Sequence, residues 1–262
     1  REKVIDDFVD SYLQGETPIP CVRCNQQVKF KDLLQTARDL DAKALVTGHY
    51  VQRFEKERAE LHRALDHSRD QSYFLFTTTQ AQLDYLRFPL GGLPKHETRE
   101  HAARFGLTVA EKPDSQDICF VPNGSYANLV SKLRPGALDA GDIIHINGTV
   151  LGRHEGIINY TIGQRKGLGV AWCEPLHVVR LDGAMNQVVV APRRDAARGD
   201  CVVGAVNWVS IAPPEEPIDV EVQVRYRSGA VPARLTPLQA TDADVAADRP
   251  HRCRLELAEE QF

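Results

Sequence analysis

The sequence lacks any apolar run of the ~20 residues that a membrane-spanning helix needs, and Lys43–Val51 and Val188–Pro192 are among its longest runs. It also lacks an apolar signal segment, because Arg1–Asp10 is charged and amphipathic, as in a chain that begins inside a longer protein. Six cysteines among 262 residues are too few for a disulfide scaffold. We therefore expect a cytoplasmic protein with no membrane partner.

An excess of positive charge is absent as well, since the formal net charge is -4. This excludes a uniformly basic nucleic-acid binder, although local arginine clusters can still bind phosphates. No fixed-period repeat is present. With 42% hydrophobic residues over its length, the chain is predicted to form two or three domains.

The first part of the chain alternates predicted helices and strands, which is typical of an α/β domain with a parallel sheet covered by helices. The predicted elements are a helix from Phe30 to Leu40, a strand at Ala44–Val51, helices at Thr79–Leu86 and Thr98–Phe105, and a strand at Leu107–Ala110. We place a domain boundary near Pro113.

A different pattern follows this boundary. It predicts a loop at Asp114–Pro122, a helix at Tyr126–Leu133, and a hairpin with a type I′ turn at Asn147-Gly148. The later strands are predicted at Val178–Leu181, Gln187–Ala191, Cys201–Val209, Val220–Tyr226, Ala233–Thr236 and Arg252–Leu257. With a second boundary at Pro213-Pro214, the predicted domains are residues 1–112, 113–212 and 213–262.

Cys21 and Cys24 form a Cys-x-x-Cys pair just before the first predicted helix, and three interpretations are open. A structural zinc site normally needs four ligands, and no second closely spaced pair is present. A thioredoxin-like redox pair fits the spacing but not the surrounding sequence. The third is a nucleophilic thiol, whose thiolate form is favoured by helix N-termini and by cations such as Arg23 and Lys29.

Cys119 lies in a polar loop at the proposed domain boundary, where catalytic groups tend to occur. A small buried hydrophobe between Ile118 and Phe120 is an equally good interpretation of this residue. Cys173, Cys201 and Cys253 are also expected to be buried.

Gly48 and His49 follow a predicted strand, and α/β sheets bind ligands at the carboxyl ends of their strands. The loop Thr161–Gly169 is glycine-rich and basic, so a phosphate backbone can approach it closely. Arg225, Arg227, Arg234 and Tyr226 lie on or near predicted strands, either to contact RNA or to form a solvated strand face.

Taken together, these motifs resemble the tRNA-specific 2-thiouridylase family, also known as MnmA or TrmU. The segments that carry the resemblance are Pro20–Phe30, Thr47–Tyr50, Asp70–Leu75, Asp117–Phe120 and Thr161–Gly169, in this order along nearly the whole chain. The resemblance implies part of an ATP-pyrophosphatase-type (adenine nucleotide alpha hydrolase-like) α/β domain, a small central α+β domain and a C-terminal β-barrel.

The resemblance also implies a reaction and its residues. ATP, with Mg²⁺, adenylates the wobble uridine of tRNA, and sulfur arrives as a persulfide on Cys119, with Cys24 as the second catalytic cysteine. A transient disulfide between Cys24 and Cys119 would then follow. The implied partners are the anticodon region of tRNA and a sulfur-donor protein, such as a cysteine desulfurase or a sulfur relay protein.

Further roles are implied position by position. Gly48 resembles a residue of the ATP site, and the tRNA-contacting positions are Cys21, His49, Asp70, Gln71, Arg225 and Tyr226. Cys21 stands where many members have an aspartate, so an acid–base role there is doubtful, and exchange of disulfides between Cys21 and Cys24 is an alternative.

The resemblance further implies that the chain begins after the family's phosphate loop and stops before its closing segment. We therefore expect it to be inactive in adenylation by itself. Two alternatives stay open: an ATP-pyrophosphatase acting on a small molecule, and a non-catalytic RNA-binding or thiol-redox module.

Overall fold

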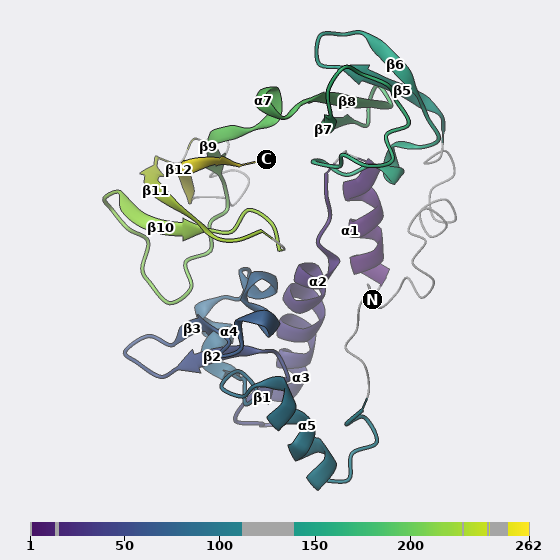
Figure 1. Cartoon of the computed structure of the whole chain (residues 1–262). Coiled ribbons are helices and arrows are strands. Elements are labelled where there is room, and N and C mark those ends of the chain that lie inside the picture. The colour runs from purple at the N-terminus through teal and green to yellow at the C-terminus, as the bar shows by residue number, and fades with distance from the viewer. Residues whose placement is uncertain are drawn as a thin grey trace. The chain divides into compact units, whose positions relative to one another are not determined.

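The structure is a computed structural model that describes residues 2–13, 16–111, 139–226, 228–239, 241 and 251–261 (Figure 1). It divides into two compact units. The first unit comprises Arg1–Pro20, Ser115–Arg198 and Glu260–Phe262, and the second comprises Cys21–Asp114 and Gly199–Glu259. The predicted loop at Asp114–Pro122, the helix at Tyr126–Leu133 and the boundary at Pro113 lie outside the described residues.

The first unit is built on a four-stranded sheet with the strand order β6-β5-β8-β7. Its strands are β5 (Gly141–His145), β6 (Val150–His154), β7 (Leu176–Asp182) and β8 (Gln187–Pro192), and its helices include α1 (Glu2–Leu13), η4 (Ile157–Asn159) and α7 (Arg193–Ala196). Strand β8 pairs in parallel with β5 and antiparallel with β7. Predicted strands at Val178–Leu181 and Gln187–Ala191 are thereby confirmed.

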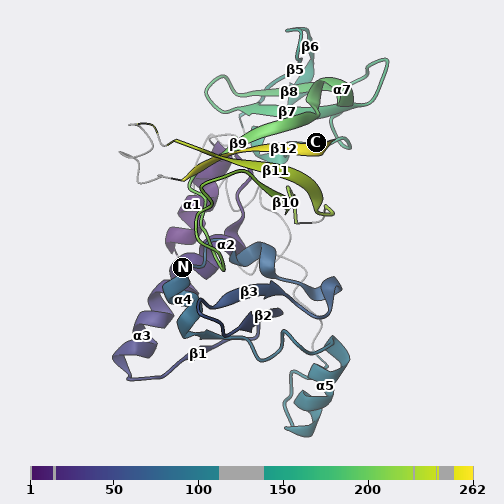
Figure 2. The same cartoon turned by 90° about the vertical axis from the view of Figure 1, so that its left-hand side faces the viewer.

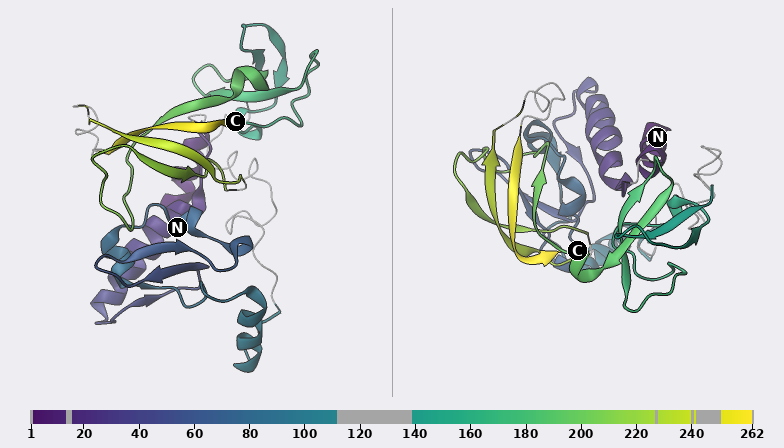
Figure 3. Two further views of the ribbon diagram at one scale, coloured as in Figure 1. Left: turned by 60° about the vertical axis from the view of Figure 1, so that its left-hand side comes forward. Right: turned by 90° about the horizontal axis from the view of Figure 1, so that it is seen from above.

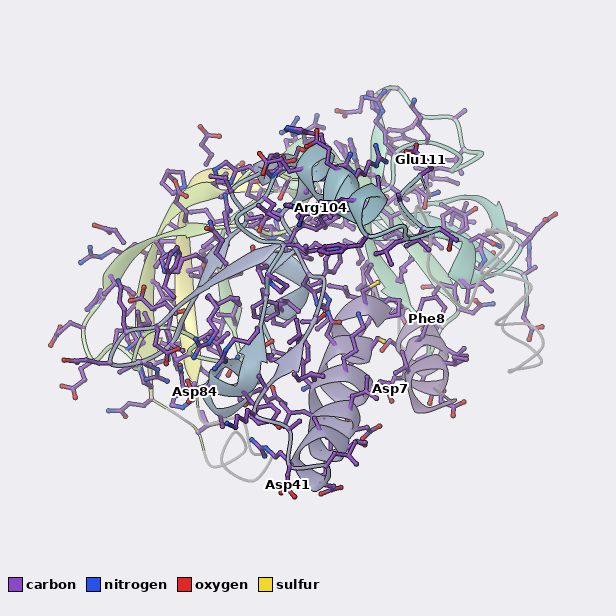
Figure 4. All side chains as sticks on the ribbon, turned by 90° about the horizontal axis from the view of Figure 1, so that it is seen from below. Asp7, Phe8, Asp41, Asp84, Arg104 and Glu111 are labelled. Carbon is purple, nitrogen blue, oxygen red and sulfur yellow. The ribbon has the colours of Figure 1, made fainter. Side chains whose placement is uncertain are left out.

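Helix α1 contributes to the core of this unit. Phe8 and Val9 are almost fully buried and belong to one apolar cluster with Ile143, Val178 and Val190 (Figure 4 labels Phe8 on α1). The apolar side chains of the helix thus cover the sheet, and their burial is the main source of stability for such a layer.

The β5–β6 hairpin is confirmed, but its predicted type I′ turn is wrong. Gly148 N donates to His145 O at 2.8 Å, so Ile146 and Asn147 are the central residues of the turn. A type I′ turn needs positive φ at both central residues, whereas Gly148, the next residue, has the positive φ of 91°. The turn is therefore not of type I′, and a left-handed glycine follows its central residues.

The second unit begins with a continuous helical segment and two small sheets. Its elements are α2 (Pro20–Arg23), the π-helix η1 (Cys24–Leu33), α3 (Leu34–Asp39), β1 (Leu45–Val46), β2 (Val51–Phe54), β3 (Glu60–Arg63), η2 (His67–Arg69), η3 (Ser72–Leu75), α4 (Gln80–Tyr85), β4 (Leu86–Arg87) and α5 (Lys95–Arg104). Strand β1 pairs in parallel with β4, and β2 pairs antiparallel with β3. Asp41, labelled in Figure 4, lies in the turn after α3 and has a left-handed φ of 55°.

Three sequence predictions for this region have different outcomes. The helix at Thr79 is confirmed, with a capping box in which Thr79 and Gln82 bond each other's backbone N–H. The strand predicted at Ala44–Val51 is interrupted: it contains β1 and the first residue of β2, and residues 47–50 between them belong to neither strand. The strand at Leu107–Ala110 is wrong: these residues form turns, and Leu107 and Val109 are exposed.

The C-terminal part of the second unit is a sheet with the order β10-β11-β12-β9 (Figures 2 and 3). Its strands are β9 (Arg198–Val203), β10 (Ile218–Val222), β11 (Val231–Leu238) and β12 (Arg252–Gln261). The strands predicted at Ala233–Thr236 and Arg252–Leu257 are confirmed. Those predicted at Cys201–Val209 and Val220–Tyr226 are confirmed only in part, because β9 ends at Val203 and β10 at Val222. Burial alternates along β11 and β12, so one face is covered and the other meets solvent. Within the described residues this sheet is open.

The segment after β9 binds this C-terminal part to the α/β part of the same unit. Asn207 Nδ2 donates to the carbonyl oxygens of Phe76 and Thr78, at 2.8 Å each, and Leu61 N donates to Ser210 Oγ at 2.7 Å. These bonds hold the sheet against the elements that carry the site. None of the helices in the described ranges is both long and apolar enough to span a lipid bilayer.

Candidate active site

Cys21 and Cys24 lie in the first turns of the helical segment that starts at Pro20. Proline suits the first helical position because its missing N–H needs no partner there. Cys21 is exposed, Cys24 is half-buried, and neither is in a disulfide within the described residues. The structure therefore places an accessible thiol at a helix N-terminus, where backbone N–H groups point outward.

Asn25 anchors this helix start to the rest of the unit. Its side chain is buried, and Nδ2 donates to Phe74 O at 3.0 Å, which ties η1 to η3. The other amide atom, Oδ1, is buried without a hydrogen-bond partner. The position of Cys24 is thus fixed by its neighbour in the chain.

His49 is buried in a group that we call the His49 cluster: Lys29, Phe30, Thr47, His49 and Phe88. The imidazole meets the Phe30 and Phe88 rings edge-on, at centroid distances of 5.8 and 6.4 Å. Its Nδ1 lies 2.8 Å from Thr47 Oγ1, and its Nε2 lies 3.4 Å from Lys29 Nζ.

The partners of His49 determine its protonation. Burial, and then the positive charge of Lys29, lower the pKa of His49 from 6.5 to about 4, so the ring is neutral near pH 7. An ammonium can only donate, so Nε2 accepts from Lys29 and the proton sits on Nδ1, facing Thr47. His49, predicted to contact tRNA, here has two protein partners.

Gly48 lies between β1 and His49 and is exposed. A Cβ added at Gly48 would meet only Leu90 Cδ1, at 3.5 Å, which is an ordinary contact. No described neighbour therefore requires glycine here, and the backbone is open to close approach by a ligand.

Asp70 and Gln71, predicted to contact tRNA, both bind backbone groups. Asp70 Oδ1 accepts from Ala64 N at 2.9 Å, and Oδ2 accepts from Ser72 Oγ at 2.6 Å. Gln71 Oε1 accepts from Tyr50 N at 2.9 Å. These side chains shape the loop that leads into η3, whatever else they contact.

A cavity of ≈ 500 Å³ brings two predicted residues together, Asp70 and Tyr226. Tyr226 is 45% exposed, and its ring lies 4.5 Å from that of Phe74 and 5.8 Å from that of Tyr73. Tyr73, which also lines the cavity, was missed as a site residue although it lies in the Asp70–Leu75 motif. Burial raises the pKa of Tyr73, and the charge of Arg225 acts in the opposite direction.

Arginines near Tyr226 have different surroundings. Arg225 is exposed, and its backbone N donates to Ser228 Oγ at 3.1 Å. Arg234 Nη1 donates to Asp219 Oδ1 at 2.7 Å across β10 and β11, so this arginine belongs to a solvated strand face. Arg227 lies outside the described residues.

The glycine-rich loop, Thr161–Gly169, belongs to the first unit and has a stiff backbone. Gly163, Gly167 and Gly169 have positive φ values of 88, 76 and 68°. Gln164 bridges the loop, because its Oε1 accepts from Thr161 N and its Nε2 donates to Lys166 O, both at 3.0 Å. Arg165 and Lys166 consequently project into solvent from a fixed frame.

The remaining cysteines differ from expectation. Cys253 is buried, as expected, whereas Cys173 and Cys201 are exposed, so that prediction was wrong for them. Cys173 follows Trp172, an exposed side chain that stacks on the buried His145, and Cys201 lies on β9 at the edge of its sheet. Cys119 is outside the described residues. Among those described, no group of three or more His, Cys, Asp or Glu could hold a metal ion.

Comparison with known proteins matches three family models along the chain. Residues 1–123 match the tRNA methyl transferase HUP domain, residues 130–192 the tRNA methyl transferase PRC-barrel domain, and residues 198–253 the aminomethyltransferase beta-barrel domain. This order confirms the predicted layout of an α/β domain, a small central domain and a C-terminal β-barrel domain.

Curated relatives agree over almost the whole chain. The tRNA-specific 2-thiouridylase MnmA of Synechococcus sp. (strain RCC307) is 55% identical over 267 residues, which cover 100% of this chain and 69% of the relative. Those of Rickettsia felis and Rhodospirillum centenum are 55% and 57% identical, and cover 93% and 90% of this chain and 67% and 62% of the relatives. The chain thus spans about two thirds of the length of these relatives. At this identity and coverage, and with the motifs in the predicted order, the chain belongs to the tRNA-specific 2-thiouridylase MnmA family.

Proposed function

We propose that this protein acts in the ATP-dependent 2-thiolation of the wobble uridine of tRNA, as a tRNA-uridine 2-sulfurtransferase. The observation that carries the proposal is the free, half-buried Cys24 thiol at a helix start that Asn25 anchors. It lies in the same unit as the open backbone at Gly48. A nucleophile and a place for a nucleotide are the two parts that this reaction needs.

The proposed reaction has four steps. The uridine C2 oxygen attacks the α-phosphate of ATP, bound with Mg²⁺, and pyrophosphate leaves. The terminal sulfur of a persulfide on Cys119 then attacks C2, and AMP leaves with the oxygen. Finally the Cys24 thiolate attacks the Cys119 sulfur, which forms a Cys24–Cys119 disulfide and leaves 2-thiouridine on the tRNA. An external thiol reductant restores the two thiols.

The tRNA contacts proposed from the family are Cys21, His49, Asp70, Gln71, Arg225 and Tyr226. Support is strongest around the cavity, where Tyr226 offers a partly exposed aromatic face and Arg225 a solvent-facing cation. Aromatic faces and arginine planes are the groups on which unpaired RNA bases stack. His49 supports the site from within the unit, because both of its ring nitrogens have protein partners.

The proposed sulfur donor is a protein such as a cysteine desulfurase or a sulfur relay protein, and the proposed compartment is the cytoplasm. Reducing conditions there keep catalytic thiols free between turnovers. This agrees with the Cys24 thiol, which is not in a disulfide within the described residues.

The experiment that tests the proposal locates the sulfur. The chain is treated with a cysteine desulfurase and cysteine, and persulfides are mapped by mass spectrometry in the unmodified protein and in Cys24→Ser, Cys119→Ser and Cys173→Ser. We expect a persulfide that only Cys119→Ser removes, with the exposed Cys173 as the matched control. A persulfide that survives in Cys119→Ser would contradict the assignment.

A second measurement separates sulfur transfer from methyl transfer, the reaction that two of the matching domain descriptions name. The tRNA product is digested to nucleosides, and the masses of the nucleosides are measured by mass spectrometry. Sulfur transfer changes the mass by the difference between sulfur and oxygen, whereas methyl transfer adds a methylene group. Full sulfur transfer by a Cys21→Ser variant of the complete enzyme would also exclude disulfide exchange between Cys21 and Cys24.

A further inference from the structure

Lys29 is a cation that has no counter-ion among the described residues. It is half-buried on η1, and its Nζ lies 3.4 Å from His49 Nε2. No carboxylate in the described part of the chain lies within ion-pair distance of this ammonium. Charged groups removed from water are normally paired with an opposite charge, because their desolvation is costly. The missing charge therefore points to a ligand.

His49 orients Lys29 but does not neutralise it. The ring is neutral and accepts one hydrogen bond through Nε2, while its Nδ1–H is directed to Thr47 Oγ1. An ammonium has three donors, so two stay available beside the one that faces His49. Phe30 and Phe88 hold the imidazole edge-on, so the direction of the Lys29 side chain is set by buried groups.

Lys29 also lies where a nucleotide site is expected. Thr47 and His49 follow β1, which pairs in parallel with β4, and open α/β sheets bind ligands at the carboxyl ends of such strands. Gly48, between them, leaves its backbone open to approach. The ammonium thus stands beside the single exposed glycine of this strand end.

The π-helix gives a second reason. In an α-helix, residues five apart point roughly 140° away from each other around the axis. In a π-helix, with its i→i+5 hydrogen bonds, residues five apart lie about one turn apart on the same side of the helix. Short π-helical segments are frequent at functional sites. Because η1 runs from Cys24 to Leu33, this spacing places the positions of Cys24 and Lys29 on the same face of the helix.

We propose that Lys29 binds a phosphate group in the reaction, and that His49 holds the Lys29 side chain in place for this contact. The proposal rests on the proposed function and adds the recognition of an anion beside Cys24. The phosphate has two possible sources, the α-phosphate of the adenosine nucleotide or the backbone of the tRNA. Lysine suits either, as a compact point charge for phosphate oxygens.

Binding to two probes tests the proposal and separates the sources. AMP and a synthetic anticodon stem-loop RNA are titrated separately into the chain and into Lys29→Met, Lys29→Arg and Lys31→Met. Lys31 is the matched control, because it is an exposed lysine on the same helix. We expect Lys29→Met to weaken one probe about tenfold or more, Lys29→Arg to retain most of the affinity, and Lys31→Met to bind like the parent.

A loss confined to AMP assigns the nucleotide phosphate, and a loss confined to the RNA assigns the backbone phosphate. Equal affinity of folded Lys29→Met for both probes, or no binding of either probe to the parent, overturns the proposal. Should Lys29→Met not fold, protection of Lys29 from reductive methylation by each probe in the parent protein gives the answer, with Lys31 as internal reference. No protection of Lys29 by either probe also overturns it.

The outcome is independent of the sulfur assignment. Loading of a persulfide onto Cys119 needs no phosphate, so Lys29→Met should accept sulfur from the desulfurase like the parent protein. Failure of the phosphate proposal would leave that persulfide unchanged. Failure of the proposed function would remove the persulfide but leave the AMP and RNA titrations measurable.

Discussion

Lys29 and Arg165 are two cations for which we propose contacts to phosphate groups. The two side chains differ in how firmly their direction is fixed. Lys29 is half-buried, and its direction is set by His49 and two phenylalanine rings. Arg165 is exposed on the glycine-rich loop, and only the backbone beneath it is fixed, by Gln164. Changes at the buried residues of the His49 cluster should therefore affect folding and chemistry together, whereas changes at the exposed cations of the loop should affect affinity and leave folding intact.

The two tryptophans make this comparison measurable, because Trp172 lies in the first unit and Trp208 in the second. Each can report its own unit by fluorescence when the other is replaced by phenylalanine.

Phe30→Ala should cause the largest loss. Phe30 is 2% exposed and packs in the core of the second unit and against His49. Truncation of a buried phenylalanine costs ~3 to 5 kcal/mol of unfolding free energy. Urea unfolding followed by Trp208 measures it, with Phe54→Ala as the control because Phe54 is 45% exposed. Equal losses for the two variants would contradict the assigned core.

Acidification should weaken the second unit through His49. The folded pKa of about 4 lies below the ordinary value of 6.5, so the unfolded chain takes up the proton first as the pH falls. The contribution of His49 is therefore complete above pH 6.5 and is lost on going down to pH 4, a loss of about 3 kcal/mol. Urea unfolding by Trp208 at several pH values measures this, and His49→Gln should show a flatter profile. The same slope in both proteins would exclude His49 as the cause.

Gln164→Ala should have a smaller effect, confined to the first unit. It removes two hydrogen bonds that brace the glycine-rich loop. At ~1 kcal/mol for each bond, the unit should lose about 1 to 2 kcal/mol. Unfolding followed by Trp172 measures the loss, and the Trp208 signal serves as the internal control. A shift of both signals would indicate that the units do not unfold separately.

Arg165→Ala and Lys166→Ala should have the smallest effect on stability, within about 0.5 kcal/mol. Each should make the salt dependence of tRNA binding shallower, by about 1 in the slope of log K against log salt concentration. Arg180→Ala is the control, because this exposed arginine of the same unit is paired with Asp182. An unchanged slope in both loop variants would remove the loop from the RNA contact surface.

Much of the fold follows from local sequence patterns. The six predicted β-strands after Leu176 all occur, because alternating or continuous apolar runs between turn residues determine strands locally. The strand predicted at Leu107–Ala110 fails, since a short apolar run cannot reveal whether a neighbouring strand exists to pair with it. The type I′ turn fails for a related reason, because the residue with left-handed backbone depends on the length of the whole connection.

The site is less predictable than the fold. Cys21, Cys24 and Gly48 were identified from motifs, and the structure gives them accessible positions. The contact between Lys29 and His49 joins residues 20 positions apart and depends on how η1 packs beside β1. A π-helix has no sequence signature comparable to a capping box, so the alignment of Lys29 with Cys24 also requires coordinates. The role of Cys119 stays a prediction from the family.

The π-helix between Cys24 and Leu33 also limits how this protein can change in evolution. Its spacing differs from that of an ordinary helix by about one residue per turn. Loss of one residue between the thiol and the ammonium would let the segment relax to α-helix while the two groups still shared a face. A substitution there leaves the number of residues between the two groups unchanged. The number of residues and the type of helix would therefore have to change together. Homologues with one residue fewer between these positions should therefore show an ordinary α-helix at this place.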